Sequence, residues 1–158
     1  MRNNIDRRRR TRPVALLLAL TAAALALGLA AAVASGMSAA TVRTHKSSLG
    51  KILINAQGRT LYLFEKDKGR HSSCYGQCAS FWPPLLTKGK PTAAAGAKAS
   101  LLGTTRRSNG TMQVTYAGHP LYRFTQDKKA GQTGGEGLKF FGGGWYVLSP
   151  SGKKIDKD

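Results

Sequence analysis

An internal repeat constrains this chain more than any other feature, because residues 50–86 resemble residues 109–152 at an offset of 60. The matched pairs are Gly50 and Gly110, Gly58 and Gly118, Leu61 and Leu121, Tyr62 and Tyr122, Phe64 and Phe124, Asp67 and Asp127, and Lys68 and Lys128. Two units of about 40 residues are too small to bury separate cores. We therefore expect the units to pack on each other as one small domain.

Each unit has the pattern of short antiparallel strands. An apolar run, Ile52–Ile54 or Met112–Val114, is followed by a glycine at position 58 or 118 and then by a second run. Two short runs around a glycine in a brief connection are typical of a β-hairpin. After residue 40, no segment shows a long apolar period of 3.6 residues, apart from the short Ala-rich stretch between the units. The sequence therefore predicts an all-β domain of two tandem pseudo-repeats.

The second unit shows the strand pattern most clearly. In Leu121–Phe124, alternation places Tyr122 and Phe124 on one face and Arg123 on the other. We expect the face with the two aromatic rings to be the buried one.

The chain divides by composition into a leader and five further parts. We expect a polar spacer at 41–49, repeat 1 at about 50–86, an Ala/Gly/Lys-rich linker at 87–108, repeat 2 at about 109–152 and a charged tail at 153–158. Trp82 pairs best with Trp145 at an offset of 63, so the glycine-rich part of repeat 2 holds about three extra residues.

The first 40 residues predict export. Arginines at positions 7 to 10 and at position 12 precede an uncharged apolar run, Val14–Ala34, of 21 residues. A signal peptide has an apolar region of about 7–15 residues, whereas a membrane-spanning helix needs about 20. We therefore expect either a signal peptide cleaved after Ala34 or Ala40, or an uncleaved helix that contacts the membrane through residues 14–34. Both place the arginines inside and the rest of the chain outside.

The exported part is strongly basic. The whole chain has a formal net charge of +18, and residues 41–158 carry 19 Lys and Arg against 6 Asp and Glu, or +13. Such a charge concentrates anionic material nearby through a screened long-range field. The basic residues are scattered, without the clustered aromatic residues of a nucleic-acid module. We expect anionic cell-wall polymer or lipid head groups as partners, and no nucleic acid.

A repeated motif then suggests a family. The string Tyr-x-Phe-x-x-Asp occurs at Tyr62–Asp67 and again at Tyr122–Asp127. Other shared words are Gly58–Tyr62, Cys74–Cys78, Trp82–Leu85 and Gly118–Tyr122. Over about residues 49–152 the chain resembles bacterial secreted repeat proteins of unknown function, often described as lipoproteins with a Yx(F/W/Y)xxD motif. The resemblance implies an exported, surface-associated protein with two tandem copies and no assigned activity. The chain departs from the lipoprotein members because it lacks the lipidated cysteine.

Cys74 and Cys78 are the only cysteines. In an exported protein a closely spaced pair most simply forms a disulfide that closes a small loop. Two alternatives remain open. The thiolates could bind a metal with His71 and a distant His119, or the pair could act as a reversible redox couple.

The motif residues also allow two interpretations. Asp67 and Asp127, if brought together, could bind a divalent cation or perform acid–base chemistry. Alternatively, each caps a turn by accepting backbone N–H bonds. The repetition favours this structural role.

The aromatic residues Tyr62, Tyr122, Trp82 and Trp145 could form a surface that stacks on sugars or quinone-like molecules. Their alternation with Phe64 and Phe124 favours core packing instead. We expect His119, in a hairpin turn, to face solvent.

The sequence contains no catalytic triad, nucleophile elbow, phosphate loop or dinucleotide fingerprint. We therefore expect a non-enzymatic surface module without a cofactor or resident metal, located outside the cell or on its surface. A metal-binding or redox-linked protein that uses the cysteine pair is the alternative. The sequence does not indicate an oligomeric state.

Overall fold

The computed structural model describes residues 38–156 of the chain. Gly36–Asp158 form one compact unit. The predicted N-terminal signal or anchor helix, with its apolar run at 14–34, lies outside the described residues. Within the part of the chain that the structure describes, no helix is long and apolar enough to cross a membrane.

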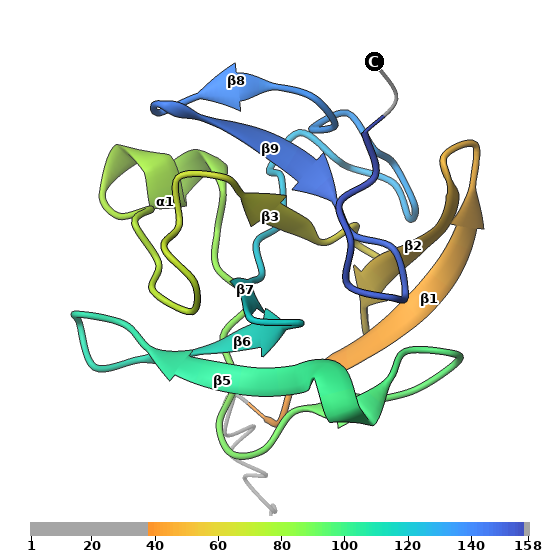
Figure 1. Ribbon diagram of the computed structural model, residues 1–158, viewed down its shortest axis with the longest axis horizontal. Helices are drawn as coiled ribbons and strands as arrows, with labels where there is room; N and C mark the ends of the chain where they lie inside the picture. Colours follow the sequence, from red (N-terminus) through yellow and green to blue (C-terminus); the bar gives the residue numbers. More distant parts are fainter. Residues whose placement is uncertain (1–37, 157–158) are drawn as a thin grey trace, which may run out of the picture. The chain divides into compact units, whose positions relative to one another are not determined.

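The domain consists mainly of short strands (Figure 1), so the prediction of an all-β fold is confirmed. In chain order the elements are β1 (Thr41–Ser47), β2 (Gly50–Asn55), β3 (Tyr62–Phe64), α1 (Gln77–Phe81), β4 (Thr92–Ala93), the 3-10 turn η1 (Ala99–Leu101), β5 (Leu102–Arg106), β6 (Met112–Tyr116), β7 (His119–Pro120), β8 (Lys139–Phe140) and β9 (Gly143–Val147).

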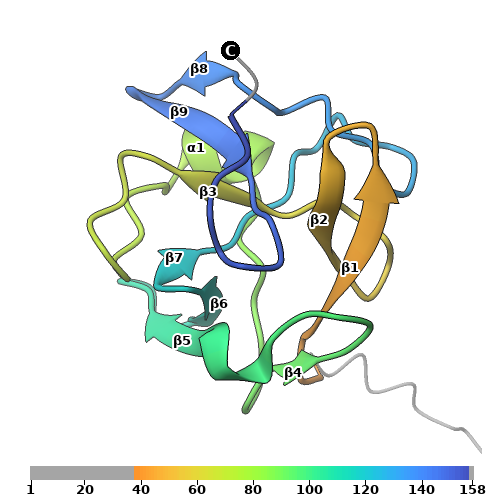
Figure 2. The ribbon, with the colours of Figure 1, turned by 45° about the vertical axis from the view of Figure 1, so that its right-hand side comes forward.

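The strands form three small sheets, with the orders β2-β1-β4, β3-β9-β8 and β5-β6-β7. In repeat 1, β1 and β2 form an antiparallel hairpin whose register pairs Val42 with Asn55. In repeat 2, β5 and β6 form the corresponding hairpin. The copies differ at the outer edge, because β4 pairs in parallel with β1, whereas β5 ends its sheet (Figure 2).

Two segment predictions differ from the structure. The stretch 41–49, expected to be a spacer, contains strand β1. The stretch 87–108, expected to be a linker, contains β4, η1 and β5. Strands β1 and β5 are rich in polar residues, and in β1 only Val42 is fully buried. β1 becomes a strand by pairing with β2, and β5 by pairing with β6. Their own sequences lack the alternating apolar residues that would have predicted a strand.

Backbone hydrogen bonds align the repeats more closely than the sequence does. Leu53 N–H donates to Leu148 O at 3.0 Å, and Val114 N–H donates to Leu85 O at 2.8 Å. These bonds make Leu53 equivalent to Val114, an offset of 61, whereas the motif residues keep an offset of 60. The turn of the β6–β7 hairpin is therefore one residue shorter than its counterpart in repeat 1.

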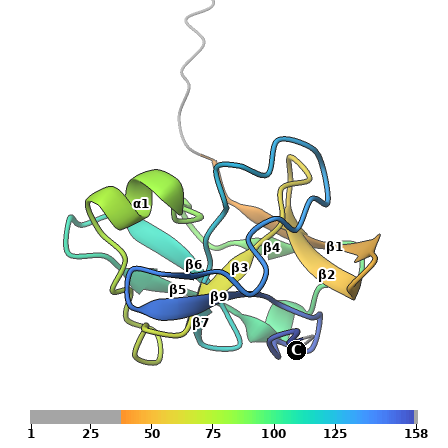
Figure 3. The same ribbon diagram turned by 90° about the horizontal axis from the view of Figure 1, so that it is seen from above.

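The repeats also diverge before each tryptophan. Helix α1 precedes Trp82 in repeat 1, whereas the β8–β9 hairpin leads into Trp145 in repeat 2 (Figure 3). Register on the far side of each tryptophan is the same, because Val147 pairs with Tyr62 and Pro84 pairs with Tyr122.

The strands separate two apolar clusters. In β3, Tyr62 and Phe64 belong to one cluster, while Leu63 belongs to the other. In repeat 2 the Tyr122 side chain is fully buried, and both Phe124 and Arg123 are half-buried. The predicted aromatic face is therefore internal, but in β3 the opposite face is internal as well.

Candidate functional site

The two motif copies meet at their tyrosines. Tyr62 N–H donates to Tyr122 O at 2.9 Å, and Tyr122 N–H donates to Tyr62 O at 3.0 Å. This reciprocal pair joins equivalent residues of the two repeats, so a pseudo-two-fold axis passes between them.

The side chains of the two motifs are exchanged between the repeats. The Tyr62 hydroxyl donates to Asp127 Oδ2 at 2.5 Å, and the Tyr122 hydroxyl donates to Asp67 Oδ2 at 2.7 Å. The tyrosine of each copy therefore binds the aspartate of the other copy. The sequence identified all four residues, but it contained no signal that the pairing crosses between repeats.

Each aspartate also fixes the loop that follows it. Asp67 Oδ1 accepts the backbone N–H of Ser73 at 2.7 Å and its hydroxyl at 2.9 Å. Asp127 Oδ1 accepts the backbone N–H of Gly134 at 2.9 Å. These bonds give the aspartates the capping role that we expected from their repetition. Among residues 38–156, no group of three or more His, Cys, Asp and Glu is placed to hold a metal ion.

Burial shifts the protonation equilibria of this network. It raises the pKa of Tyr62 and Tyr122, and the neighbouring aspartates raise these pKa values further. Burial also raises the pKa of Asp67 and Asp127, although the hydrogen bonds that they accept oppose the shift. The raised tyrosine pKa values keep both hydroxyls protonated at neutral pH, so each can donate to the aspartate that it contacts. We call the two cross-repeat pairs, Tyr62 with Asp127 and Tyr122 with Asp67, the clamp.

A stack of four aromatic rings lies beside the clamp. Trp82 and Trp145 are 1% and 0% exposed and stack in parallel, with ring centroids 3.9 Å apart. Phe64 of repeat 1 stacks on Trp145 at 4.0 Å, and Phe124 of repeat 2 stacks on Trp82 at 4.3 Å. These rings are therefore core residues and do not form an open surface for a sugar or a quinone.

One glycine makes the close packing around the stack possible. A Cβ atom at Gly135 would lie 2.6 Å from the Trp82 ring and 3.0 Å from the Tyr62 ring. The Gly135 N–H donates to the Tyr62 hydroxyl at 3.3 Å. A side chain at this position would therefore displace both the stack and the clamp.

Cys74 and Cys78 form a disulfide, as predicted. Cys74 is 0% and Cys78 is 7% exposed, and both pack in the same apolar cluster as Trp82. The disulfide leaves no thiolate for a metal, and its burial hinders attack by an external thiol. The geometry is that of a structural cross-link at the start of α1.

Arg107 connects repeat 2 to this cysteine loop, and sequence reasoning missed it. The side chain is 4% exposed. Its guanidinium donates to Cys74 O at 2.6 Å, to Ser72 Oγ at 2.8 Å and to Gln113 Oε1 at 2.6 Å. The Ser72 hydroxyl lies 2.8 Å from the Tyr122 hydroxyl, so Arg107 extends the clamp to the disulfide. A buried cation in a chain rich in surface cations has no distinguishing sequence pattern.

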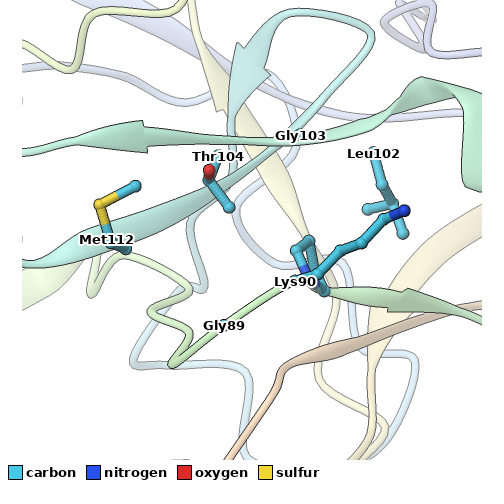
Figure 4. A pocket seen from close by; sticks show the side chains of 7 residues that line it. Gly89, Lys90, Leu102, Gly103, Thr104 and Met112 are labelled. Carbon is cyan, nitrogen blue, oxygen red and sulfur yellow. The ribbon is translucent and has the colours of Figure 1, made fainter.

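Two surface pockets flank the domain. One, of about 650 Å³, is lined by Leu63, Phe64, Glu65, Asp67, His119, Gly152, Lys153 and Lys154. In this pocket His119 is half-buried, and Lys154 Nζ contacts Glu65 Oε1 at 2.9 Å. The other, of about 400 Å³ (Figure 4), is lined by Gly89, Lys90, Pro91, Leu102, Gly103, Thr104 and Met112.

The charged side chains are unequally distributed between interior and surface. Every lysine among residues 38–156 is exposed. The ion pairs recorded in this part of the chain both involve Lys154, with Glu65 at 2.9 Å and with Asp156 at 2.8 Å. Asp67 and Asp127 instead accept hydrogen bonds from the repeat junction. The lysine charge therefore faces solvent, while the Arg107 guanidinium and two carboxylates are engaged internally.

Comparison with known proteins identifies the repeats. The sequence pattern of a family described as "Secreted repeat of unknown function" matches residues 43–86 and 103–149, which together are more than half of the chain. The first matched segment covers most of β1 and all of β2, β3 and α1, and the second covers most of β5 and all of β6 to β9. The curated proteins and the solved structures yielded no significant match.

Proposed function

This chain belongs to the family of secreted repeats of unknown function. We propose that its domain is a non-enzymatic module that binds anionic material of the cell envelope. The observation that carries the proposal is the outward-facing positive charge. Residues 38–156 hold 18 Lys and Arg against 5 Asp and Glu. All of their lysines are exposed, and Lys154 alone supplies the recorded ion pairs.

Long-range attraction, and not a single specific contact, is the mechanism that fits this distribution. The exposed lysines come from many turns and strands, including Lys46, Lys88 and Lys128. Each exposed charge contributes little alone, but their summed field concentrates a polyanion at the surface. Such binding is fast and weakens as salt screens the field.

Two internal features support a binding module over an enzyme. The motif aspartates are occupied by the tyrosines of the opposite repeat, and the cysteines are joined in a buried disulfide. The groups that most resemble chemical machinery thus stabilise the fold. The exposed basic surface remains as the part of the domain that contacts other molecules.

The location that we propose is the outer side of the cytoplasmic membrane or the cell surface. The family is described as secreted. An apolar run at 14–34, if uncleaved, would hold the basic domain next to anionic lipid and cell-wall polymer. Release after cleavage would leave electrostatic binding as the means of retention.

The test measures retention of residues 36–158 on immobilised poly(glycerol phosphate) and on phosphatidylglycerol vesicles. These residues form a compact unit with its own apolar clusters. We expect retention at about 10 mM salt and release near 1 M, because the Debye length falls from about 30 Å to about 3 Å. Uncharged dextran and phosphatidylcholine vesicles serve as matched surfaces without charge.

A charge variant links retention to the lysines. We expect Lys128→Glu/Lys129→Glu, which changes two exposed residues outside the clamp, to elute at lower salt than the wild type. The charge-conserving variant Lys128→Arg/Lys129→Arg should elute at the same salt concentration as the wild type. No retention of the wild type on either anionic surface at low salt would refute the proposed function.

A further inference from the structure

Three phenylalanines, Phe81, Phe140 and the half-buried Phe141, form a surface cluster that we call the aromatic tip. Phe81 ends α1 and is 44% exposed, and Phe140 in β8 is 56% exposed. The Phe141 ring lies between them, with centroids 6.1 Å from Phe81 and 6.5 Å from Phe140. The segments are far apart in sequence but adjacent in the fold, where α1 lies beside the β8–β9 hairpin (Figure 1).

The turn at the tip holds an aromatic residue in an unfavourable conformation. Phe140 pairs with Gly143, so Phe141 and Gly142 are the two central residues of the hairpin turn. Both have positive φ values, 58° and 86°, as in a type I′ turn. Such turns favour Asn-Gly, and a bulky side chain at the first central position is strained. Strain of this kind in an exposed turn is typical of functional sites.

One lysine contacts the turn of the tip, and a second precedes Phe140 in the sequence. Lys66 Nζ donates to Phe141 O at 3.1 Å and so helps to hold the turn. Lys139 is exposed next to Phe140. The combination of exposed phenylalanine rings with these two lysines matches the boundary of an anionic bilayer, where rings enter the acyl region and ammonium groups contact head-group phosphates.

We propose that the aromatic tip inserts into the interface of anionic lipid bilayers, with Phe140 and Phe81 as the penetrating residues. This inference rests on the proposed function and names anionic lipid as the class of ligand. A hydrophilic polymer would satisfy the lysines, but it would leave two half-exposed phenylalanine rings in water. The tip is a turn beside a helix end, and none of its rings lines either of the two surface pockets described above.

The experiment compares binding of residues 36–158 to phosphatidylglycerol/phosphatidylcholine vesicles and to immobilised poly(glycerol phosphate). We expect Phe140→Ser to weaken vesicle binding at least about fivefold, because a half-exposed phenylalanine gains roughly half of the free energy of full burial. Phe81→Ser/Phe140→Ser should weaken it further. Polymer binding should change less than twofold, because it depends on charge. Met112→Ser, a half-buried apolar residue away from the tip, is the matched control.

A spectroscopic variant reports insertion independently of affinity. The native tryptophans are 1% and 0% exposed, so a tryptophan in Phe140→Trp is the solvent-exposed emitter. We expect its emission to shift to shorter wavelength, and its acrylamide quenching to fall, when anionic vesicles are added. Circular dichroism and thermal unfolding check that each variant is folded.

The outcomes separate the inference from the proposed function. If wild-type protein binds vesicles and polymer but the serine variants bind vesicles equally well, the proposed insertion of the aromatic tip is refuted. The proposed electrostatic binding is then still supported. An unchanged Phe140→Trp emission on bound vesicles would also overturn insertion. If wild-type protein binds neither surface, the proposed function fails and the inference fails with it.

Discussion

For individual side chains, the exchange of tyrosine and aspartate between the repeats explains why the motif occurs in pairs. Tyr62 needs Asp127, and Tyr122 needs Asp67, at 2.5 and 2.7 Å respectively. Loss of one hydroxyl leaves a buried carboxylate short of one donor, which costs about 1–3 kcal/mol. One copy of the motif alone would therefore lack the aspartate acceptor of its tyrosine and the tyrosine donor of its aspartate.

A double-mutant cycle tests the exchange directly. We expect Tyr62→Phe and Asp127→Asn to show a coupling free energy of about 1–2 kcal/mol in urea unfolding, because the two residues share a hydrogen bond. The control cycle pairs Tyr62→Phe with Asp67→Asn, residues of the same motif copy that do not contact each other in the clamp. Its coupling should be near zero. Coupling within the copy that equals coupling between copies would contradict the exchange.

The raised carboxyl pKa values predict an unusual pH dependence. Burial raises the folded-state pKa of Asp127 above its ordinary value of 3.8. The folded protein therefore binds this proton more tightly than the unfolded chain, and stability from this group is fully present below pH 3.8 and is lost as pH rises through the folded pKa. Relative to Asp127→Asn, which does not titrate, the wild type should gain stability as pH falls from 7 toward 4. Urea unfolding at a series of pH values measures this difference.

For the turns and loops, the disulfide is the feature with the clearest energetic effect. The ring closed by Cys74 and Cys78 is short, so its loss should destabilise the domain by about 2 kcal/mol. We expect Cys74→Ser/Cys78→Ser to unfold at lower urea concentration by that amount. Because the sulfurs are buried, the native disulfide should resist dithiothreitol until the domain unfolds. Rapid reduction of the folded wild type would argue for a redox role instead.

A second turn offers a stabilising change. Ala117 is exposed and has φ 50°, and Gly118 follows with φ 85° in the β6–β7 hairpin. Asparagine tolerates this left-handed conformation better than alanine. We expect Ala117→Asn to raise the free energy of unfolding by about 0.5–1 kcal/mol, measured in urea. Ala117→Val should lower it, and a loss of stability in Ala117→Asn would contradict the turn assignment.

The sequence predicts features that depend on neighbouring residues, and it does not predict features that depend on contacts between distant segments. Hairpins and buried tyrosines were predictable, because alternation and turn glycines act locally. Strands β1 and β5 were not, because their polar residues become strands only through pairing with β2 and β6. The exchange and the burial of Arg107 depend on how one repeat docks on the other. The aromatic tip was missed because the hairpin turn and the helix end that form it are about 60 residues apart.

For the domain as a whole, the pseudo-two-fold arrangement implies that neither repeat is stable alone. Strand β3 of repeat 1 takes β9 of repeat 2 as its partner, and the Trp82 ring stacks on Trp145. A separated repeat would expose this ring and lose its strand partner. It would also leave the carboxylate of its motif aspartate without the tyrosine donor. These losses exceed what about 40 residues of core can offset.

Fragment complementation tests this dependence. We expect residues 36–96 and 97–158, divided after the exposed Gly96, to be unfolded separately by circular dichroism. Mixing them should restore β structure and the exciton-coupled circular dichroism of the Trp82–Trp145 stack. Each fragment supplies the strand partner and the tryptophan ring that the other lacks. Asp127→Ala in the second fragment should weaken reassembly through the lost Tyr62 bond, whereas Lys128→Ala, next to it but exposed, should not. A stably folded single fragment would show that the duplicated units are independent, and the exchange would then be incidental to folding.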